Sequence, residues 1–435
     1  MGMKWIADVH DSIWTTADGT PLGGFAYTYD AAGRITARRH ALGTNRFDRA
    51  YAYDDLDRLA ADGSVSYAYD AAGNRTAKTG DVEGAVAYTR GAGDRLASWT
   101  GGAYTYDAAG NVTRIVRDGR PTLDLSWNGR YQLVSVSTNG VFAEGYAYDA
   151  LGRRASTTTW EGTVRYVYDD NWQVIADLDS NGNVLRSYVW GEGIDRLLAV
   201  KVGAKSYAAL TDVQGTVWGL ADGTDVVARW TYDAWGNVLS GEASDPVLAA
   251  FRYRFQGREF SAVTGLTNFR MRWYDPGTGR WLSKDPIRVV GGMNLYSFVL
   301  NKPINCNDFD GMDIHYTSEG GGHSVIWVDK PGSDGNRTIS FEFGPLSGNI
   351  FWGESVVITS EECGHHGSKT IKTTVEQDEK AIQKINEIKN KKPKYNILFN
   401  NCADLVRDIL DAAGIDLPWR LIDTPTKLEN DLKNK

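Results

Sequence analysis

Aromatic and polar residues alternate in short runs through about the first 240 residues of the chain. A tyrosine, a small residue and a second tyrosine precede an aspartate, and a glycine often follows three residues later. Alternation at every second position is typical of a β-strand and places both tyrosine rings on one face. The pattern Asp-x-x-Gly predicts a turn, because aspartate can bind the backbone two residues on and glycine tolerates a positive φ. The aspartates of these copies are Asp30, Asp54, Asp70, Asp107, Asp149, Asp169 and Asp233.

Repetition of this unit predicts a mainly β shell of strand-turn-strand repeats over residues 1–245. One unit cannot bury its own tyrosine face, so neighbouring copies must share a continuous β surface. We interpret the tyrosines and aspartates of the repeat as scaffold and assign them no chemistry.

Composition limits the class of protein. The chain has 48 Gly, 22 Tyr and 15 Trp, which argues against disorder, and a formal net charge of −8, which argues against nucleic acid as its main partner. No run of about 18 apolar residues predicts a transmembrane segment, and the start lacks the apolar run of a signal peptide, so export would use another signal. The three cysteines do not form a disulfide framework or a CxxC metal site.

The repeats resemble the YD repeats of Rhs proteins and of the C components of Tc toxins, over about residues 20–312. The resemblance implies strands wound into a hollow cage that holds a toxic C-terminal polypeptide until delivery. The repeats are too few for a complete cage. We therefore expect a partial cage and a chain that is the C-terminal portion of a longer protein or a short separate cassette.

Residues 246–312 contain the phrases Arg272-Trp-Tyr274-Asp275-Pro276 and Gly279-Arg280-Trp281-Leu282-Ser283-Lys284-Asp285-Pro286. They resemble the Rhs-associated core, which in that family plugs the cage and acts as an aspartyl autoprotease. The family closes with Asp-Pro-x-Gly-Leu, and this chain closes with Asp308-Phe309-Asp310-Gly311-Met312.

The resemblance to the core implies cleavage between Met312 and Asp313, with Asp285 and Asp308 as the catalytic pair. Two carboxylates that share one proton can supply an acid and a base. The alternative is that both aspartates form turns in a plug that does not cut.

Composition changes at the same boundary. Residues 1–312 contain 26 Arg and 6 Lys, whereas residues 313–435 contain 3 Arg and 12 Lys. The reversal predicts a separate C-terminal domain over 313–435. Within it, apolar runs predict a hairpin of 320–328 with 338–343, a helix over 375–389, a strand over 395–399 and a helix over 402–413.

Cys402 falls on the first turn of the last predicted helix, after the N-cap residue Asn401. Unpaired amides and the positive helix end lower the pKa of a thiol there, as a cysteine nucleophile requires. His323, at the start of the hairpin, is the candidate base. The alternative is a small buried cysteine on the apolar face of an amphipathic helix.

Residues 315–420 resemble circularly permuted papain-like enzymes, namely NlpC-like amidases and the lecithin:retinol acyltransferase group. The resemblance implies a small α+β domain with a cysteine hydrolase or acyltransferase activity. Cys402 would be the nucleophile, His323 the general base, and Glu342 the orienting residue, ahead of Ser340 and His315.

Together the resemblances imply a toxin kept in the bacterial cytoplasm before export and then delivered into a competitor cell. A type VI-like or Tc-like apparatus would deliver it, an immunity protein would protect the producer, and a peptide, protein or lipid would be the substrate. No cofactor, metal or nucleic acid is expected. Two alternatives stay open: a non-enzymatic cell-surface protein, and a metal-dependent nuclease tail that uses Cys363, His365 and His366, residue types that bind zinc.

Overall fold

The computed structural model describes most of the chain up to Met312 and, beyond it, only short stretches that form strands. The described residues are 3–5, 12–16, 18–80, 84–191, 195–287, 293–312, 315–316, 325–328, 337–343, 349–352, 356–359 and 367–373. The chain divides into two units, the first comprising 1–29 with 35–317 and the second 30–34 with 318–435. No helix among the described residues is long and apolar enough to span a membrane.

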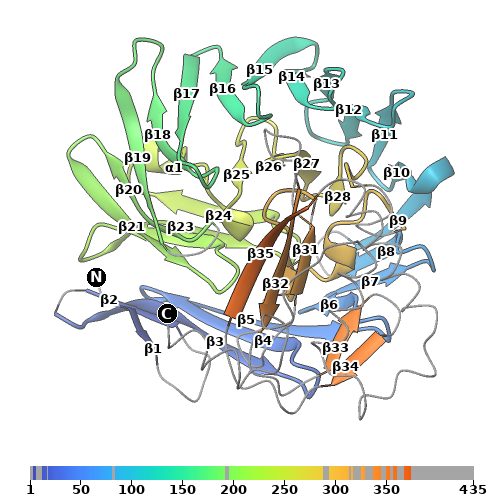
Figure 1. Cartoon of the computed structure of the whole chain (residues 1–435), viewed down its shortest axis with the longest axis horizontal. Helices are drawn as coiled ribbons and strands as arrows, with labels where there is room; N and C mark the ends of the chain where they lie inside the picture. Colours follow the sequence, from blue (N-terminus) through green and yellow to red (C-terminus); the bar gives the residue numbers. More distant parts are fainter. Residues whose placement is uncertain are drawn as a thin grey trace. The chain divides into compact units, whose positions relative to one another are not determined.

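The main sheet of the first unit is a meander of 24 described strands, in which each strand pairs antiparallel with the next along the chain (Figure 1). The prediction of a mainly β shell is confirmed. The strands are β1 (Met3–Trp5), β2 (Ser12–Thr15), β3 (Pro21–Tyr29), β4 (Ile35–Leu42), β5 (Asn45–Tyr53), β6 (Leu59–Asp62), β7 (Val65–Tyr69), β8 (Arg75–Gly80), β9 (Gly84–Arg90), β10 (Leu96–Trp99), β11 (Gly102–Tyr106), β12 (Val112–Arg117), β13 (Leu123–Trp127), β14 (Leu133–Thr138), β15 (Val141–Tyr148), β16 (Arg154–Thr159), β17 (Gly162–Tyr168), β18 (Val174–Leu178), β19 (Val184–Trp190), β20 (Leu197–Val202), β21 (Lys205–Thr211), β22 (Val217–Ala221), β23 (Val226–Tyr232) and β24 (Val238–Ala243).

The aspartate of each repeat closes the turn that the sequence predicts. In the turn between β15 and β16, Asp149 Oδ1 accepts the N–H of Leu151 at 3.0 Å and that of Arg153 at 2.9 Å, and Gly152 has a φ of 87°. One carboxylate thus satisfies two backbone donors that the sheet leaves unpaired. The same pair of hydrogen bonds, to residues two and four positions on, occurs at Asp54, Asp169, Asp179, Asp212 and Asp233.

The two tyrosines of a repeat have different roles. Tyr146 is buried, whereas the Tyr148 hydroxyl donates to the Leu133 carbonyl, at the start of the neighbouring strand β14, at 2.8 Å. Tryptophan takes the second role in two strands that the tyrosine pattern missed: the indole N–H of Trp127 donates to Val112 O at 2.7 Å, and that of Trp190 to Val174 O at 2.8 Å. A ring with a polar tip is what this position requires.

Residues 246–312 form a closing segment of short elements. A four-stranded sheet is its centre, and β29 pairs with β30 beyond Met312. The short helices of the first unit are α1 (Pro246–Ala249), η1 (Ala92–Asp94), η2 (Phe255–Gly257) and η4 (Val299–Asn301), and the short strands are β25 (Glu259–Phe260), β26 (Thr267–Phe269), β27 (Arg272–Asp275), β28 (Arg280–Trp281), β29 (Cys306–Asn307) and β30 (His315–Tyr316).

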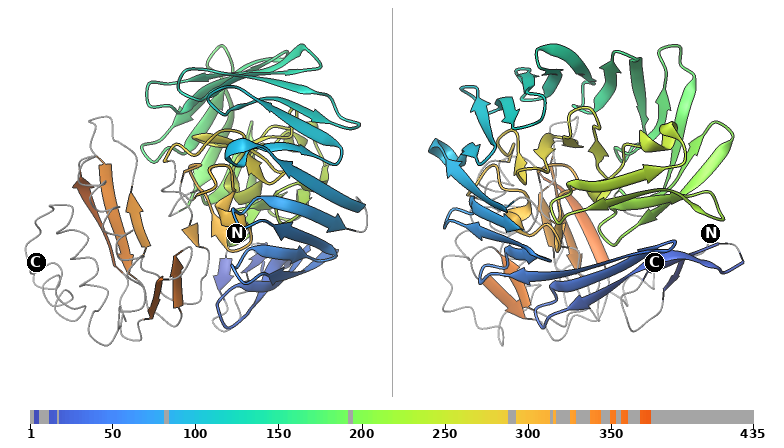
Figure 2. Two further views of the ribbon diagram at one scale, coloured as in Figure 1. Left: turned by 90° about the vertical axis from the view of Figure 1, so that its right-hand side faces the viewer. Right: turned by 180° about the vertical axis from the view of Figure 1, so that it is seen from behind.

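The main sheet curves around this closing segment, as Figure 1 and the view from behind in Figure 2 show. Buried polar contacts link the segment to repeats far away in the sequence. Arg117 Nη2 lies 2.6 Å from Asp275 Oδ2, and the Tyr296 hydroxyl donates to Gly110 O at 2.8 Å. Aromatic rings pack together within the closing segment: the ring centroids of Tyr274 and Phe298 lie 4.3 Å apart.

In the second unit, β31 (Val325–Val328), β32 (Arg337–Phe343) and β35 (Gly367–Thr373) form an antiparallel sheet, and β33 (Asn349–Trp352) pairs with β34 (Val356–Thr359). The pairing of β31 with β32 confirms the predicted hairpin. The predicted helices over 375–389 and 402–413 and the strand over 395–399 lie outside the described residues.

Candidate functional site

Arg272, on β27, brings the two predicted catalytic aspartates together. Its Nη2 donates to Asp308 Oδ2 at 3.1 Å, and its Nη1 lies 2.8 Å from Asp285 Oδ2 without the alignment of a hydrogen bond. The side chains of Arg272, Asp308 and Asp285 are 3%, 1% and 7% exposed, respectively. Arg272 also stacks on Trp281, with its guanidinium carbon 3.9 Å from the ring centroid, so its orientation is fixed from a second side.

The chain just before the predicted cut folds back onto Asp308. Asp308 Oδ1 accepts the N–H of Gly311 at 2.7 Å and that of Met312 at 3.0 Å, and Arg272 Nε donates to Gly311 O. Gly311 has a φ of 79°, and a Cβ there would lie 2.5 Å from the Phe269 carbonyl oxygen. Only glycine fits so close to a neighbouring backbone in this conformation. Met312 is 7% exposed and fills the apolar position for which the related motif has leucine.

Both aspartates bind protons more tightly than a free aspartate. Burial is the main cause that raises the pKa of Asp308 to about 7; Arg272 opposes it, and Asp310 and Asp285 add to it. Burial also raises the pKa of Asp285, against Arg272. A cluster of this kind holds one proton near neutral pH, as an acid–base pair requires.

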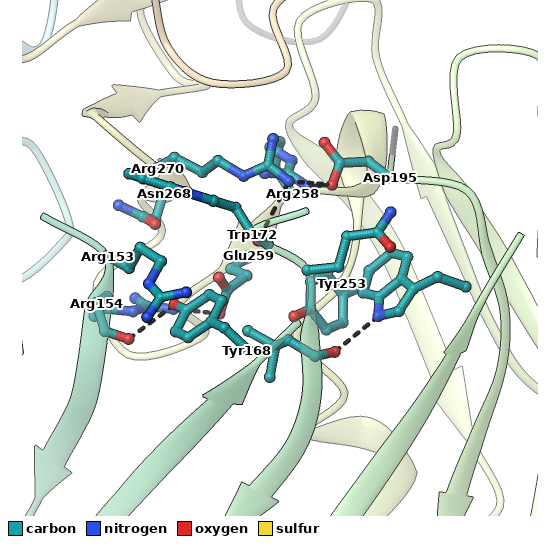
Figure 3. Close-up of a pocket in the computed structure, with 13 residues that line it drawn as sticks. Arg153, Arg154, Tyr168, Trp172, Asp195, Tyr253, Arg258, Glu259, Asn268 and Arg270 are labelled. Carbon is teal, nitrogen blue, oxygen red and sulfur yellow. Dashed lines mark hydrogen bonds and ion pairs between the residues drawn. The ribbon is translucent and has the colours of Figure 1, made fainter. Parts of the chain in front are cut away.

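A second polar cluster holds the chain at Phe309. Arg258 Nη1 and Arg270 Nη1 donate to the Phe309 carbonyl at 3.1 and 2.9 Å, and both guanidiniums pair with Asp195. Figure 3 shows the two arginines converging with Asp195 at one end of a pocket that also contains the ion pair between Arg154 and Glu259. The cavity has a volume of about 20 Å³, which is room for about one water molecule.

Two glutamines fix the strand that precedes Asp308. Gln214 Nε2 donates to Asn307 Oδ1 at 2.9 Å, and Asn307 Nδ2 donates back to Gln214 O at 3.0 Å. Gln256 Nε2 donates to Cys306 O at 3.0 Å. The backbone from Cys306 to Met312 is therefore held by side chains from the repeats and from the closing segment.

The remaining predicted site residues lie on described strands outside the Arg272 cluster or outside the described residues. Cys402, His323 and Asp313 lie outside the described residues, as do Cys363, His365 and His366. Glu342 lies on β32, where its backbone pairs with Val325 and Ser368; Ser340 is on the same strand and His315 is on β30. These assignments stay predictions.

Sequence reasoning gave Arg272 no role. Arg272 is 36 residues from Asp308 along the chain, and the turn that ends β27 separates it from Asp285. The available signal was an arginine within an aromatic strand, because a guanidinium buried among apolar rings needs a carboxylate partner.

Comparisons with known proteins agree with the fold. Residues 16–304 match the family model described as the teneurin YD-shell, and residues 369–432 match the model described as the Lnb N-terminal periplasmic domain. Among solved structures, a Photorhabdus luminescens Tc holotoxin pore has a TM-score of 0.53 and 19% sequence identity, covering 70% of this chain and 18% of that chain. That likeness shows a shared fold.

Several sequence relatives are named as toxins or as nucleases. The tRNA nuclease WapA of Bacillus subtilis is 31% identical over 307 residues, which is 68% of this chain and 11% of the relative. The toxin subunit YenC1 of Yersinia entomophaga is 30% identical over 225 residues, 44% of this chain and 22% of the relative. The double-stranded DNA deaminase toxin A of Burkholderia cenocepacia is 29% identical over 378 residues, 75% of this chain and 25% of the relative. The chain thus spans a quarter or less of the length of these relatives.

The prediction of a cysteine hydrolase or acyltransferase is wrong, because the relatives are named as tRNA nucleases and as a DNA deaminase toxin. The spacing around Cys402 could not by itself establish that activity, because a buried cysteine on the apolar face of a helix would follow the same spacing as a nucleophile on its first turn. The prediction of a YD-repeat shell is confirmed, because residues 16–304 match the family model of that shell. The chain belongs to the teneurin YD-shell family.

Proposed function

We propose that this chain is the shell and closing segment of a delivered toxin that cuts itself after Met312 and so separates the residues that follow. One observation carries the proposal: two buried carboxylates share the Arg272 guanidinium, and one of them, Asp308, accepts the amide of Met312 at 3.0 Å. A general acid and a general base next to a held backbone are the parts that peptide hydrolysis needs.

The proposed step is hydrolysis of the bond between Met312 and Asp313. One water is consumed, a carboxylate forms on Met312, and an amine forms on Asp313. Asp285 takes a proton from the water, and Asp308, whose pKa is raised to about 7 mainly by burial, supplies a proton to the departing nitrogen. Arg272 holds both carboxylates and the Gly311 carbonyl, which keeps the segment from moving away during the attack.

The family assignment and the names of the relatives, two as toxins and one as a tRNA nuclease, support a cargo role for the residues after Met312. We propose that these residues form the toxic part, that a delivery apparatus exports the protein, and that an immunity protein protects the producer. Since relatives are named for nuclease and deaminase activity, nucleic acid is the first substrate class to test.

The test is intact-mass analysis of the purified chain. Wild type should yield two fragments that join at Met312–Asp313, and Asp308→Asn and Asp285→Asn should leave the chain whole. Asp222→Asn is the control, since Asp222 is an exposed turn aspartate, and it should cleave like wild type. A wild-type chain that stays whole, a cut at another bond, or normal cleavage in Asp308→Asn would overturn the proposal.

The cargo role has its own test in cells. Expression of the full chain should slow bacterial growth and damage tRNA or DNA, and Asp308→Asn, which keeps the tail attached, should do so less. Equal growth with intact nucleic acid in both strains would contradict this part of the proposal while leaving the cleavage result in place.

A further inference from the structure

Asp310 is a third carboxylate beside the proposed cut. Its Oδ1 accepts the Met312 N–H at 3.0 Å, the same N–H that lies 3.0 Å from Asp308 Oδ1. Its backbone carbonyl accepts the N–H of Met271, the neighbour of Arg272, at 2.9 Å. Asp310 is thus fixed at its backbone to the chain that carries Arg272, while its side chain reaches the residue before the cut.

We propose that Asp310 is a positioning residue for self-cleavage, which holds the Met312 amide and whose negative charge keeps a proton on the Asp285–Asp308 pair. The inference rests on the proposed function and adds to it. Neither the closing motif nor the alternation of the strands singles out Asp310, which occupies the variable position x of Asp-Pro-x-Gly-Leu.

The charges around Asp308 support this role. Asp285 and Asp310 act on it as anions, and Arg272 is the cation that contacts it. Two other arginines of the closing segment, Arg258 and Arg270, bind the Phe309 carbonyl and are paired with Asp195.

Two carboxylates contact the Arg272 guanidinium and the charge of a third, Asp310, acts on both of them, so negative charge is in excess, and burial makes that excess costly. Uptake of one proton relieves the excess. Burial is the largest cause of the raised pKa of Asp308, and Asp310 raises the pKa of Asp308 and of Asp285 further. Asp310 therefore extends the pH range over which the pair keeps its proton.

Two substitutions separate the charge of Asp310 from its hydrogen bond. Asp310→Asn keeps an oxygen that can accept the Met312 N–H but removes the charge, whereas Asp310→Ala removes both. Asp310→Glu keeps the charge and serves as the conservative rescue. None of these changes touches Arg272, Asp285 or Asp308.

The experiment starts from full-length chain isolated uncut in urea and diluted into buffers from pH 5 to 9. Gels follow the rate of cleavage, and tryptophan fluorescence gives the fraction folded. Wild-type cleavage should slow as the pH rises through about 7, where Asp308 loses its proton. In Asp310→Asn that decline should move to lower pH by about half a unit or more. Asp310→Ala should show the same shift and should also cleave about tenfold more slowly at every pH, because it removes the hydrogen bond from the Met312 N–H to Asp310.

The outcomes distinguish this inference from the proposed function. The charge role is wrong, and self-cleavage stands, if wild type cleaves and the cleavage rate of Asp310→Asn has the same pH dependence. This includes a variant whose rate is lower than that of wild type by the same factor at every pH. If Asp310→Glu fails to restore the wild-type profile while folding normally, the positioning role is also wrong. If folded wild type does not cleave at any pH, both proposals fail together.

Discussion

Glu259 links the closing segment to the shell, and the strength of that link can be measured at this residue. Its carboxylate, on β25, forms an ion pair with Arg154 of β16 and lies 2.7 Å from Nε of Arg252. The side chain is 9% exposed. Burial alone would raise the pKa of Glu259, but the two guanidiniums outweigh it and lower the pKa to about 2.

The shift from the ordinary value of 4.5 to about 2 corresponds to about 3 kcal/mol of stability at neutral pH. The folded-state pKa is lowered, so this contribution is complete above pH 4.5. It is lost as the pH falls toward 2, because the unfolded chain takes up a proton before the folded chain does. Glu259→Gln should therefore destabilise the shell by about 3 kcal/mol at pH 7 and by about 1 kcal/mol at pH 3.

Urea unfolding followed by tryptophan fluorescence at the two pH values is the assay. At pH 7 the midpoint should fall by about 1 M, given a denaturant slope of about 3 kcal/mol per molar. Glu242→Gln is the matched control: Glu242 lies 2.9 Å from Arg229 but is 69% exposed, and its loss should cost less than about 1 kcal/mol. Equal midpoints for the two variants, or a Glu259→Gln effect that does not shrink at pH 3, would refute the reasoning.

Three further outcomes follow from the shell. Gly110→Ala should lower the thermal midpoint more than Gly119→Ala, by the equivalent of about 2 kcal/mol, because both glycines have positive φ but only a Cβ at 110 meets the Tyr296 hydroxyl, at 2.5 Å. Tyr69→Phe should lower the free energy of unfolding in urea by about 1 kcal/mol, since it removes a 2.7 Å hydrogen bond to the neighbouring strand. Burial raises the pKa of the Cys306 thiol to about 12. In a variant with the other two cysteines replaced by serine, iodoacetamide should therefore label Cys306 only as the chain unfolds. Fast labelling of the folded chain would count against this.

The repeat could be predicted because its interactions are local. Asp149 binds amides two and four residues on, so the sequence alone contains both partners of the turn. The repeat pattern did not include Trp127 and Trp190 because it was defined by tyrosine. The fold requires only an aromatic ring whose polar group reaches a carbonyl on the neighbouring strand. The physical requirement is broader than the residue type that reveals it.

The candidate site was predictable only in part, because its interactions are not local. Asp285 and Asp308 were paired by resemblance to a family, while the guanidinium that joins them comes from Arg272 on β27. Their raised pKa values have burial as the first cause, and burial exists only once the chain is folded. No pattern of neighbouring residues could indicate how deeply Asp308 would lie.

This dependence on burial has a consequence for when the proposed cut can occur. Asn307, next to Asp308, is held by Gln214, and the Phe309 carbonyl is held by two arginines that pair with Asp195. Gln214 and Asp195 belong to the repeats, so Asp308 reaches its place only after those strands have formed. In the unfolded chain Asp308 would ionise at an ordinary pKa and could not act as an acid at neutral pH. Cleavage would therefore follow formation of the repeat strands that carry Asp195 and Gln214, because only then is Asp308 held and buried.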